Sequence, residues 1–125
     1  MPKFVTCINC MDGRAQLPVF NWIRQNCSAE YVDMITEAGA DGYLVKHDPI
    51  PDNILYKIKI SVQKHGSDRI FIVGHYDCAG HPVDEDTHRK DIIASVDKIK
   101  KSFPDCAVSG LWLSDKWEVE KIAER

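Results

Sequence analysis

The sequence predicts an α/β fold, a single three-layer sandwich in which a mainly parallel sheet has helices on both faces. Short runs rich in β-branched and apolar residues alternate along the chain with longer segments whose apolar residues recur at helical spacing. Glycine- and proline-containing stretches separate these segments. The chain has 125 residues, the size of one ordinary domain, so we expect residues 1–125 to form a single domain.

The first third of the chain predicts a strand, a helix and a second strand. Residues 3–9 are mostly apolar or β-branched and too few for a helix, which favours a buried strand. Residues 15–26 have apolar side chains at helical spacing, and Pro18 is tolerated because it lies in the first turn. Residues 30–36 are again typical of a strand.

The middle of the chain predicts a loop, a helix and a third strand. The two glycines of residues 38–42 indicate a break in regular structure, and we expect a loop from there to Pro51. Asp52 is a candidate N-cap for a helix, and Gly66 stands where a glycine would end it. The third strand is expected over residues 69–73.

The last third predicts a helix, a strand and a short tail. A turn-rich segment spans residues 74–82, and residues 91–103 have the apolar stripe of an amphipathic helix. Residues 106–113 read as the fourth strand. The tail carries Val119 and Ile122, and we expect it to form a last helix or a turn.

This order of elements predicts a parallel sheet with right-handed crossovers. If the first strand lies between the second and the third, the strand order becomes 2-1-3-4. The switch point then lies between strands one and three, outside whose carboxyl ends such sheets bind ligands. Cys10 follows the first strand, and His75 and Cys78 follow the third, so we expect these three residues to meet. Two cysteines and one histidine suit a tetrahedral Zn²⁺, and three protein ligands leave a position for water or substrate.

Asp12 and Arg14 lie just beyond Cys10 and are candidate catalytic residues. An aspartate oriented by arginine could accept a hydrogen bond from zinc-bound water, and without Arg14 the same carboxylate could bind the zinc and close the site. A solvated surface pair is the alternative. His81 and His88 could relay protons to solvent, although histidines in such segments are more often simply exposed.

Cys7 and Cys10 have a Cys-x-x-Cys spacing that leaves two other readings open. The pair could join His75 and Cys78 in a closed, structural zinc site, or it could form a thioredoxin-like redox pair. Strand alternation argues against the first, because it places Cys7 on the opposite face. The redox motif normally opens a helix, whereas Cys7 lies inside a strand.

Composition excludes several classes of function. The formal net charge is −3, from 16 basic and 19 acidic residues, which argues against binding to nucleic acid or an anionic membrane. We identify neither an apolar run of the roughly 20 residues that span a bilayer nor a secretory signal. Five cysteines, an odd number, fit reduced thiols and metal ligands, so we expect a cytoplasmic protein.

The segments Cys10-Met11-Asp12-Gly13-Arg14 and His75-Tyr76-Asp77-Cys78 resemble the two motifs of the β-class carbonic anhydrases, Cys-x-Asp-x-Arg and His-x-x-Cys. The resemblance implies Zn²⁺ at Cys10, His75 and Cys78, and a catalytic Asp12–Arg14 dyad. It also implies reversible hydration of carbon dioxide to bicarbonate by zinc-bound hydroxide, in a homodimer or larger homo-oligomer. The chain lacks the N-terminal helical extension common in that family.

Two alternative functions remain beside this one. The same site could hydrolyse another small electrophile, carbon disulfide or carbonyl sulfide, since fold and ligands do not separate these substrates. The domain could instead be a non-catalytic, zinc-binding regulatory module whose fourth ligand is Asp12, Cys7 or a partner's residue.

Overall fold

The computed structural model describes residues 2–125. Its strands are β1 (Phe4–Asn9), β2 (Tyr31–Thr36), β3 (Arg69–His75), β4 (Ala107–Leu113) and β5 (Val119–Glu124). Its helices are the 3₁₀ turn η1 (Gly13–Ala15), α1 (Gln16–Cys27), α2 (Ala40–Lys46), α3 (Asp52–Lys59), the π-helical turn η2 (Ile60–Lys64) and α4 (Glu85–Ser102). Within residues 2–125, none of these helices has the length and apolar character needed to cross a lipid bilayer.

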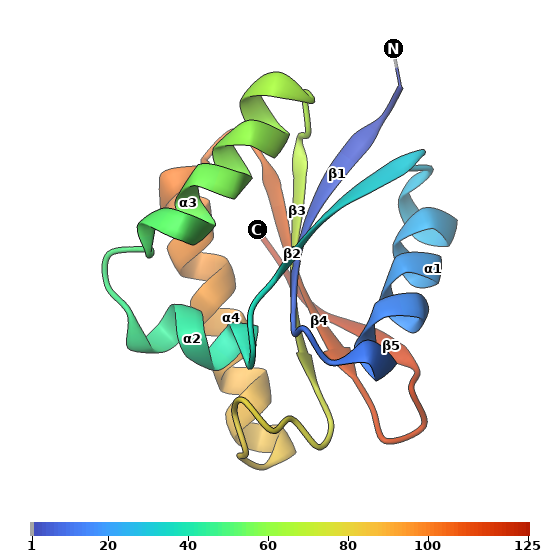
Figure 1. Ribbon diagram of the computed structural model, residues 1–125, viewed down its shortest axis with the longest axis vertical. Coiled ribbons are helices and arrows are strands. Elements are labelled where there is room, and N and C mark those ends of the chain that lie inside the picture. The colour runs from blue at the N-terminus through green and yellow to red at the C-terminus, as the bar shows by residue number, and fades with distance from the viewer. Residues whose placement is uncertain (1) are drawn as a thin grey trace.

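The five strands form one sheet in the order β2-β1-β3-β4-β5. The first four strands run parallel, and β5 is antiparallel to β4. Helix α1 covers one face of the sheet, while α2, α3 and α4 cover the other (Figure 1). The predicted three-layer architecture and the order 2-1-3-4 are therefore confirmed, with one further strand added at the edge.

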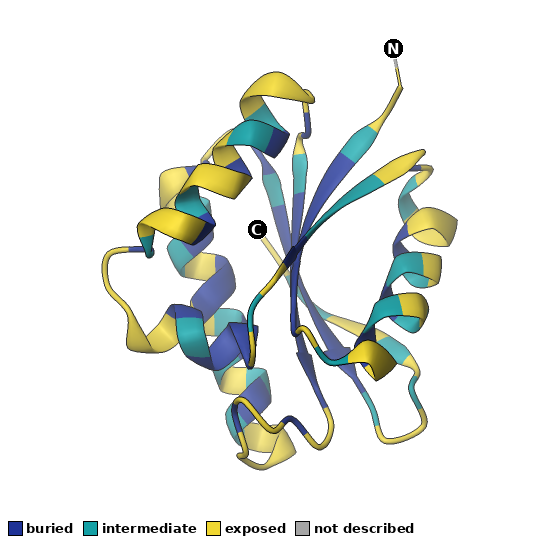
Figure 2. Ribbon diagram, viewed as in Figure 1, coloured by how far each residue is buried: buried dark blue, intermediate teal, exposed yellow. Residues whose placement is uncertain are grey.

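Successive side chains of β1 point to opposite faces of the sheet, so this strand contributes to the core on both sides. Val5 and Cys7 face α1 and pack with Phe71, whereas Ile8 faces the opposite side and packs with Ile72 and the helices there. The strands are accordingly buried along most of their length, and the helices expose only their outer faces (Figure 2). Each fully buried isoleucine of this kind contributes about 1.5–3 kcal/mol to folding.

Helix α2 occupies the segment where we expected a loop. Gly39 precedes it with a left-handed φ of 59°, and the helix runs on through Gly42. Gly42 lies against the His81 ring: a Cβ at this position would lie 2.4 Å from the His81 Nδ1 atom, so the site requires glycine. The glycine that suggested a break in the local sequence is thus a packing requirement set by a distant loop.

The tail forms β5, so the predicted helix or turn is wrong. Val119 and Ile122 are three positions apart in the sequence, a spacing compatible with one face of a helix. In a strand the same odd spacing directs side chains to opposite faces. Val119 packs with the α1 side of the core and Ile122 with the other side, which matches the second case.

Several element boundaries differ from prediction. Helix α4 begins at Glu85 rather than residue 91, because Asp84 caps it and accepts a hydrogen bond from the Thr87 amide at 2.8 Å. Strand β3 continues to His75, which pairs with β4. Asp52 is the first residue of α3 rather than its N-cap. At this position its negative charge interacts favourably with the positive end of the helix dipole.

Candidate metal centre

Cys10, His75 and Cys78 come together at the carboxyl ends of β1 and β3. The strands are parallel neighbours, so the residues that follow β1 and close β3 reach the same edge of the sheet. One ligand atom from each residue lies within 4.8 Å of the other two, and the two Sγ atoms are 3.9 Å apart. All three residues are buried.

The His75 ring is oriented as a ligand. Its Nδ1 lies 2.7 Å from the Tyr76 carbonyl oxygen, to which it donates its proton. In the neutral ring this leaves the lone pair on Nε2, and that buried atom has no hydrogen-bond partner among residues 2–125. A backbone carbonyl that fixes the tautomer in this way is typical of metal-binding histidines.

The two thiols are in contact with each other. The hydrogen bond with Cys78 lowers the pKa of Cys10, and the Gly39 amide at 3.4 Å lowers it further. The same contact raises the pKa of Cys78. Burial lowers the pKa of His75, but its contacts with Cys10 and the Tyr76 carbonyl outweigh burial and raise it.

The donor set fits Zn²⁺. Two sulfurs and one imidazole nitrogen suit a borderline-soft ion in tetrahedral coordination, and the orphaned His75 Nε2 gains a partner when a cation binds. Neighbouring polar side chains hold the Cys10 backbone in place. The Asn9 side chain accepts from the Cys10 amide at 2.8 Å, and the Gln16 side chain donates to the Cys10 carbonyl at 2.7 Å.

Asp12 and Arg14 form a two-pronged ion pair beside these ligands. Arg14 donates from Nε to Asp12 Oδ1 at 3.1 Å and from Nη2 to Oδ2 at 2.7 Å. Asp12 Oδ1 also caps η1 by accepting from the Arg14 amide at 2.9 Å. The pairing lowers the pKa of Asp12 to about 2, so the carboxylate is ionised at neutral pH. Asp12 Oδ2 lies 4.0 Å from His75 Nε2.

Two further residues hold Arg14, and sequence reasoning missed both. Asp77 accepts from Arg14 Nη1 at 3.2 Å with its side chain and from Nη2 at 3.0 Å with its carbonyl. The Trp117 ring lies 4.9 Å from the guanidinium carbon. The position of Asp77 between two expected ligands could have indicated that it lies near the site. The sequence contains no such indication for Trp117, because this residue reaches the site only through the unexpected β4–β5 hairpin.

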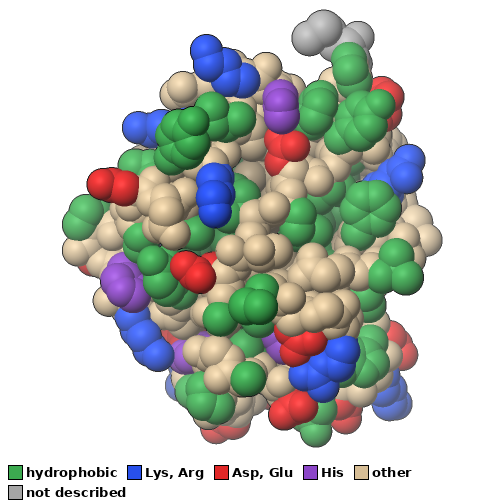
Figure 3. Space-filling view, in the orientation of Figure 1, with side chains coloured by type: hydrophobic (Ala, Val, Ile, Leu, Met, Phe, Trp, Pro, Cys, Tyr) green, Lys and Arg blue, Asp and Glu red, His purple; other side chains and the backbone are tan. Residues whose placement is uncertain are grey.

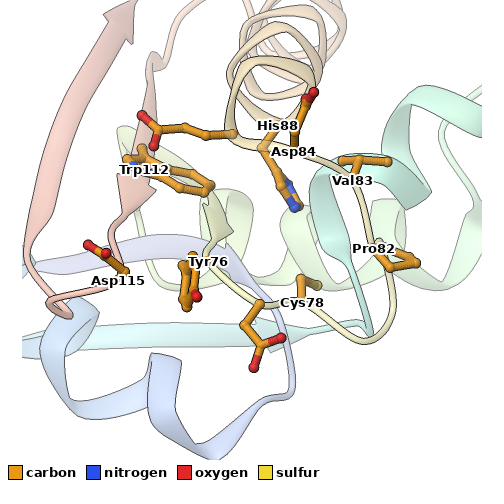
Figure 4. A pocket seen from close by; sticks show the side chains of 10 residues that line it. Tyr76, Cys78, Pro82, Val83, Asp84, His88, Trp112 and Asp115 are labelled. Atoms are coloured by element: carbon orange, nitrogen blue, oxygen red, sulfur yellow. The ribbon is translucent and has the colours of Figure 1, made fainter.

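A cavity of about 430 Å³ adjoins the site. Tyr76, Cys78, His88, Trp112 and Asp115 are among the residues that line it (Figure 4). Of the three expected ligands, Cys78 lines this cavity.

The other sequence candidates lie elsewhere. Cys7 packs in the α1 side of the core and is not among the residues whose ligand atoms meet at the site, and burial raises the pKa of its thiol. His81 and His88 are both buried, so the expectation that they are simply exposed is wrong. Their burial follows from α4 beginning earlier than predicted and from α2 packing beneath His81.

Comparison with known proteins identifies the family of this chain and structures that share its fold. Residues 1–123 match the family model described as "Putative carbonic anhydrase". A β-carbonic anhydrase, isoform I, from Trichomonas vaginalis has a similar structure, with a TM-score of 0.68 and 18% identity, covering 97% of this chain and 83% of that chain. Carbonic anhydrase from Streptococcus mutans gives 0.69 and 18%, covering 98% and 83%.

A third similar structure is one of two tetrameric β-carbonic anhydrases from Sordaria macrospora. It has a TM-score of 0.71 and 11% identity, and the match covers 99% of this chain and 82% of that chain. At these identities the structures establish a shared fold. A search of curated proteins found no significant match.

Proposed function

The chain belongs to the "Putative carbonic anhydrase" family, and from this premise we propose that it is a zinc enzyme that interconverts carbon dioxide and bicarbonate. The observation that carries the proposal is the meeting of Cys10, His75 and Cys78, with the unpartnered His75 Nε2 facing the thiols and an ionised Asp12 next to them. The reaction adds water to carbon dioxide and yields bicarbonate and one proton.

Each side chain has a distinct task in this proposal. Cys10, His75 and Cys78 hold Zn²⁺, which supplies a Lewis acid that activates water near neutral pH. Asp12, held ionised by Arg14, accepts a hydrogen bond and so orients the attacking oxygen toward the substrate. Arg14 occupies both Asp12 oxygens, which keeps this carboxylate from serving as a fourth ligand.

The same contacts weigh against the non-catalytic alternatives. A closed site needs a fourth protein ligand, but Asp12 is paired with Arg14, and Cys7 is packed in the α1 side of the core and does not join the converging group. A redox role for Cys7 needs an accessible thiolate, whereas this thiol is fully buried and its pKa is raised.

The test combines metal analysis of the full-length protein with a stopped-flow pH-indicator assay. We expect about one zinc ion at the cysteine site and acceleration of carbon dioxide hydration. Carbon disulfide and carbonyl sulfide run in parallel show whether the same site serves those substrates instead. Zinc-loaded protein that is inactive on carbon dioxide would refute the proposal.

A matched pair of variants tests the role of Asp12. Asp12→Asn should keep zinc while lowering the hydration rate about 10- to 100-fold, as is typical when a group supporting a metal site is lost. Asp105→Asn, an exposed aspartate on the loop before β4, is the control and should change neither. Equal rates for the two variants would remove Asp12 from the mechanism.

We also propose a homodimer or larger homo-oligomer in the cytoplasm. The tetrameric state of the Sordaria macrospora relatives supports the first part. All five cysteines are free thiols, which fits a reducing compartment. Light scattering coupled to gel filtration measures the oligomeric state, and a monomer at micromolar concentration would contradict it.

A further inference from the structure

A second group of metal-ligating side chains lies apart from the cysteine site. Asp41 comes from α2, His81 from the loop after β3, and His88 from α4. One ligand atom from each lies within 4.8 Å of the other two. The exposed fraction is 1% for Asp41, 5% for His81 and 1% for His88, so the group is closed off from bulk solvent.

Each histidine of this group has one nitrogen held by a carboxylate. His88 Nδ1 lies 2.7 Å from Asp41 Oδ2, and His81 Nε2 lies 2.6 Å from Asp91 Oδ2. A ring nitrogen at this distance from a carboxylate carries the proton. In the neutral rings the lone pairs are therefore on His88 Nε2 and His81 Nδ1.

These two nitrogens are buried and have no hydrogen-bond partner among residues 2–125. Leaving a buried polar atom unpaired costs free energy, and native proteins rarely do so without a reason. The rings lie next to each other, with centroids 5.0 Å apart and planes nearly perpendicular. A carboxylate on one ring nitrogen and a free lone pair on the other is the arrangement that prepares a histidine to bind a metal.

The surrounding backbone is shaped to this group. The ideal Cβ of Gly42 would lie 2.4, 2.5 and 2.7 Å from three atoms of the His81 ring, so the ring lies face-on over this glycine. That contact uses the face of the ring and leaves the in-plane lone pair of Nδ1 free. A Cβ on Gly74 would lie 2.8 Å from Asp41 Oδ2, so this carboxylate also depends on a glycine beside it.

The charge around the adjoining cavity favours a cation. Four carboxylates line this cavity together with His88: Asp77, Asp84, Glu85 and Asp115. Figure 4 shows the His88 side chain extending from α4 toward the loop that carries Cys78 and Pro82. The nearby Arg89 is neutralised by Glu85 at 2.8 Å and Glu120 at 2.9 Å. Asp77 and Glu85 are paired with arginines, whereas Asp84 and Asp115 form no salt bridge within the described part of the chain, so this wall of the cavity is net negative and favours a cation near His88.

We propose that His81 Nδ1 and His88 Nε2 bind a divalent transition-metal cation at a second site. Two imidazole nitrogens, with water completing the coordination, suit Zn²⁺ and the neighbouring ions Co²⁺ and Fe²⁺. Asp41 and Asp91 are positioning residues that hold the His88 and His81 rings by their other nitrogens. A cation at this site cross-links the loop after β3 and α4.

Cobalt is the probe that separates the two sites. Full-length protein is stripped of metal, reloaded with Co²⁺ and analysed for bound metal and visible absorption. We expect two ions per chain. The first produces thiolate-to-cobalt charge-transfer bands from Cys10 and Cys78, and the second adds only ligand-field bands, because its donors are nitrogen and oxygen. A wild-type protein that saturates with one ion would overturn the proposal and leave the two imidazoles a metal-free role.

Variants identify the residues that bind the second Co²⁺ ion. His88→Gln should bind one Co²⁺ with the thiolate bands intact, whereas Cys10→Ser with Cys78→Ser should bind one without them. His65→Gln is the matched control, since His65 is also paired with an aspartate, Asp33 at 2.7 Å, but lies outside the group, and it should bind two. A second ion that survives His88→Gln would be adventitious and would refute the assignment.

Asp91→Asn provides a milder test that leaves every proposed ligand in place. Loss of the Asp91 carboxylate behind His81 should weaken the affinity for the second ion about 10- to 100-fold and leave the affinity for the first unchanged. Addition of the second equivalent should also raise the melting temperature of the wild-type protein, and this increase should be smaller in Asp91→Asn. Identical titrations of variant and wild type would contradict the role of Asp91.

Discussion

Arg14 shows how one side chain can set the chemistry of its neighbours. Its guanidinium is shared between two carboxylates, Asp12 and Asp77, and it rests on the Trp117 ring. Asp12 is therefore ionised and held in one orientation beside His75. Asp77 and Trp117 keep Arg14 from rotating away, so the pair near the proposed metal depends on residues from three separate segments.

Removing Arg14 should release Asp12. In Arg14→Ala we expect the pKa of Asp12 to rise from about 2 toward its ordinary value of 3.8. A lowered pKa stabilises the fold above pH 3.8, and this contribution disappears as pH falls through about 2. The variant should therefore be less stable than wild type above pH 3.8, and this difference should shrink as pH falls toward about 2. Carboxyl-carbon NMR titration measures the pKa, and an unchanged value would contradict the pairing.

The freed carboxylate in Arg14→Ala should also reach the metal. We expect hydration activity to fall about 10- to 100-fold while zinc is retained. Arg24→Ala is the control, because Arg24 packs on the Phe20 ring of α1 and does not contact the site. A Co²⁺-loaded variant that still changes its spectrum on addition of azide would count against closure by Asp12.

Cys7 and Cys10 should respond oppositely to the same substitution. Cys10→Ser should lose the metal of the cysteine site, whereas Cys7→Ser should keep it. Cys7→Ser places a hydroxyl in the α1 side of the core, and an unpaired buried hydroxyl there should lower the free energy of unfolding by about 1–3 kcal/mol. Metal analysis and urea denaturation measure the two effects. Loss of metal in both variants would revive the four-ligand site.

Among the elements, α4 illustrates why helix boundaries are hard to predict from apolar spacing alone. Its apolar stripe starts at Ile92, yet the helix begins two turns earlier. Asp84 caps it, and Glu85 and Asp86 place negative charge in the first turn. The extra turns bring His88 beneath the sheet, where it meets Asp41. A capping signal therefore decided the placement of a residue central to the second site.

The Asp84 cap should stabilise α4 in a pH-dependent way. The Thr87 hydrogen bond lowers the pKa of Asp84, so the ionised cap stabilises the fold above the ordinary carboxyl pKa and this benefit is lost as pH falls through the lowered value. Asp84→Ala should lower the melting temperature at pH 7, and the difference should shrink in acid. Asp86→Ala removes the same charge without a cap bond and should have a smaller effect.

At the scale of the whole molecule, two loops must touch for the site to form. Gly39, before α2, packs directly on Gly80, after Cys78, and a Cβ on Gly39 would lie 2.6 Å from the Gly80 carbonyl carbon. The Gly39 amide also donates to Cys10 Sγ. The surface away from this junction is mixed in charge, with acidic and basic side chains interspersed on the face seen in Figure 3.

Adding one methyl group at this junction should separate the loops. Gly80→Ala places a Cβ 2.6 Å from the Ala38 carbonyl carbon, which forces backbone movement. We expect the free energy of unfolding to fall by about 1–3 kcal/mol and zinc affinity to decrease. Gly13→Ala is the control, since nothing lies within 4 Å of its Cβ position. Equal stability and zinc content in both variants would show that close packing of the loops is unnecessary.

The sequence alone determined the parallel core and the edge at which the site forms. Apolar runs and helical periodicity are local properties, so β1 to β4 and α1 could be predicted from them. The strand order 2-1-3-4 further required β1 to lie between β2 and β3, which the family resemblance implies. Cys10, His75 and Cys78 could be grouped because each lies at or just after the end of a strand, and parallel topology brings such ends together.

Only the tertiary structure decided the remaining features. The His81 ring packs on Gly42 of α2 and requires glycine there, and Trp117 contacts Arg14 because β5 turns back along β4. His81 and His88 are buried because the loop after β3 and α4 fold over α2. Each of these outcomes depends on contacts between segments far apart in the chain, and local spacing carries no information about such contacts.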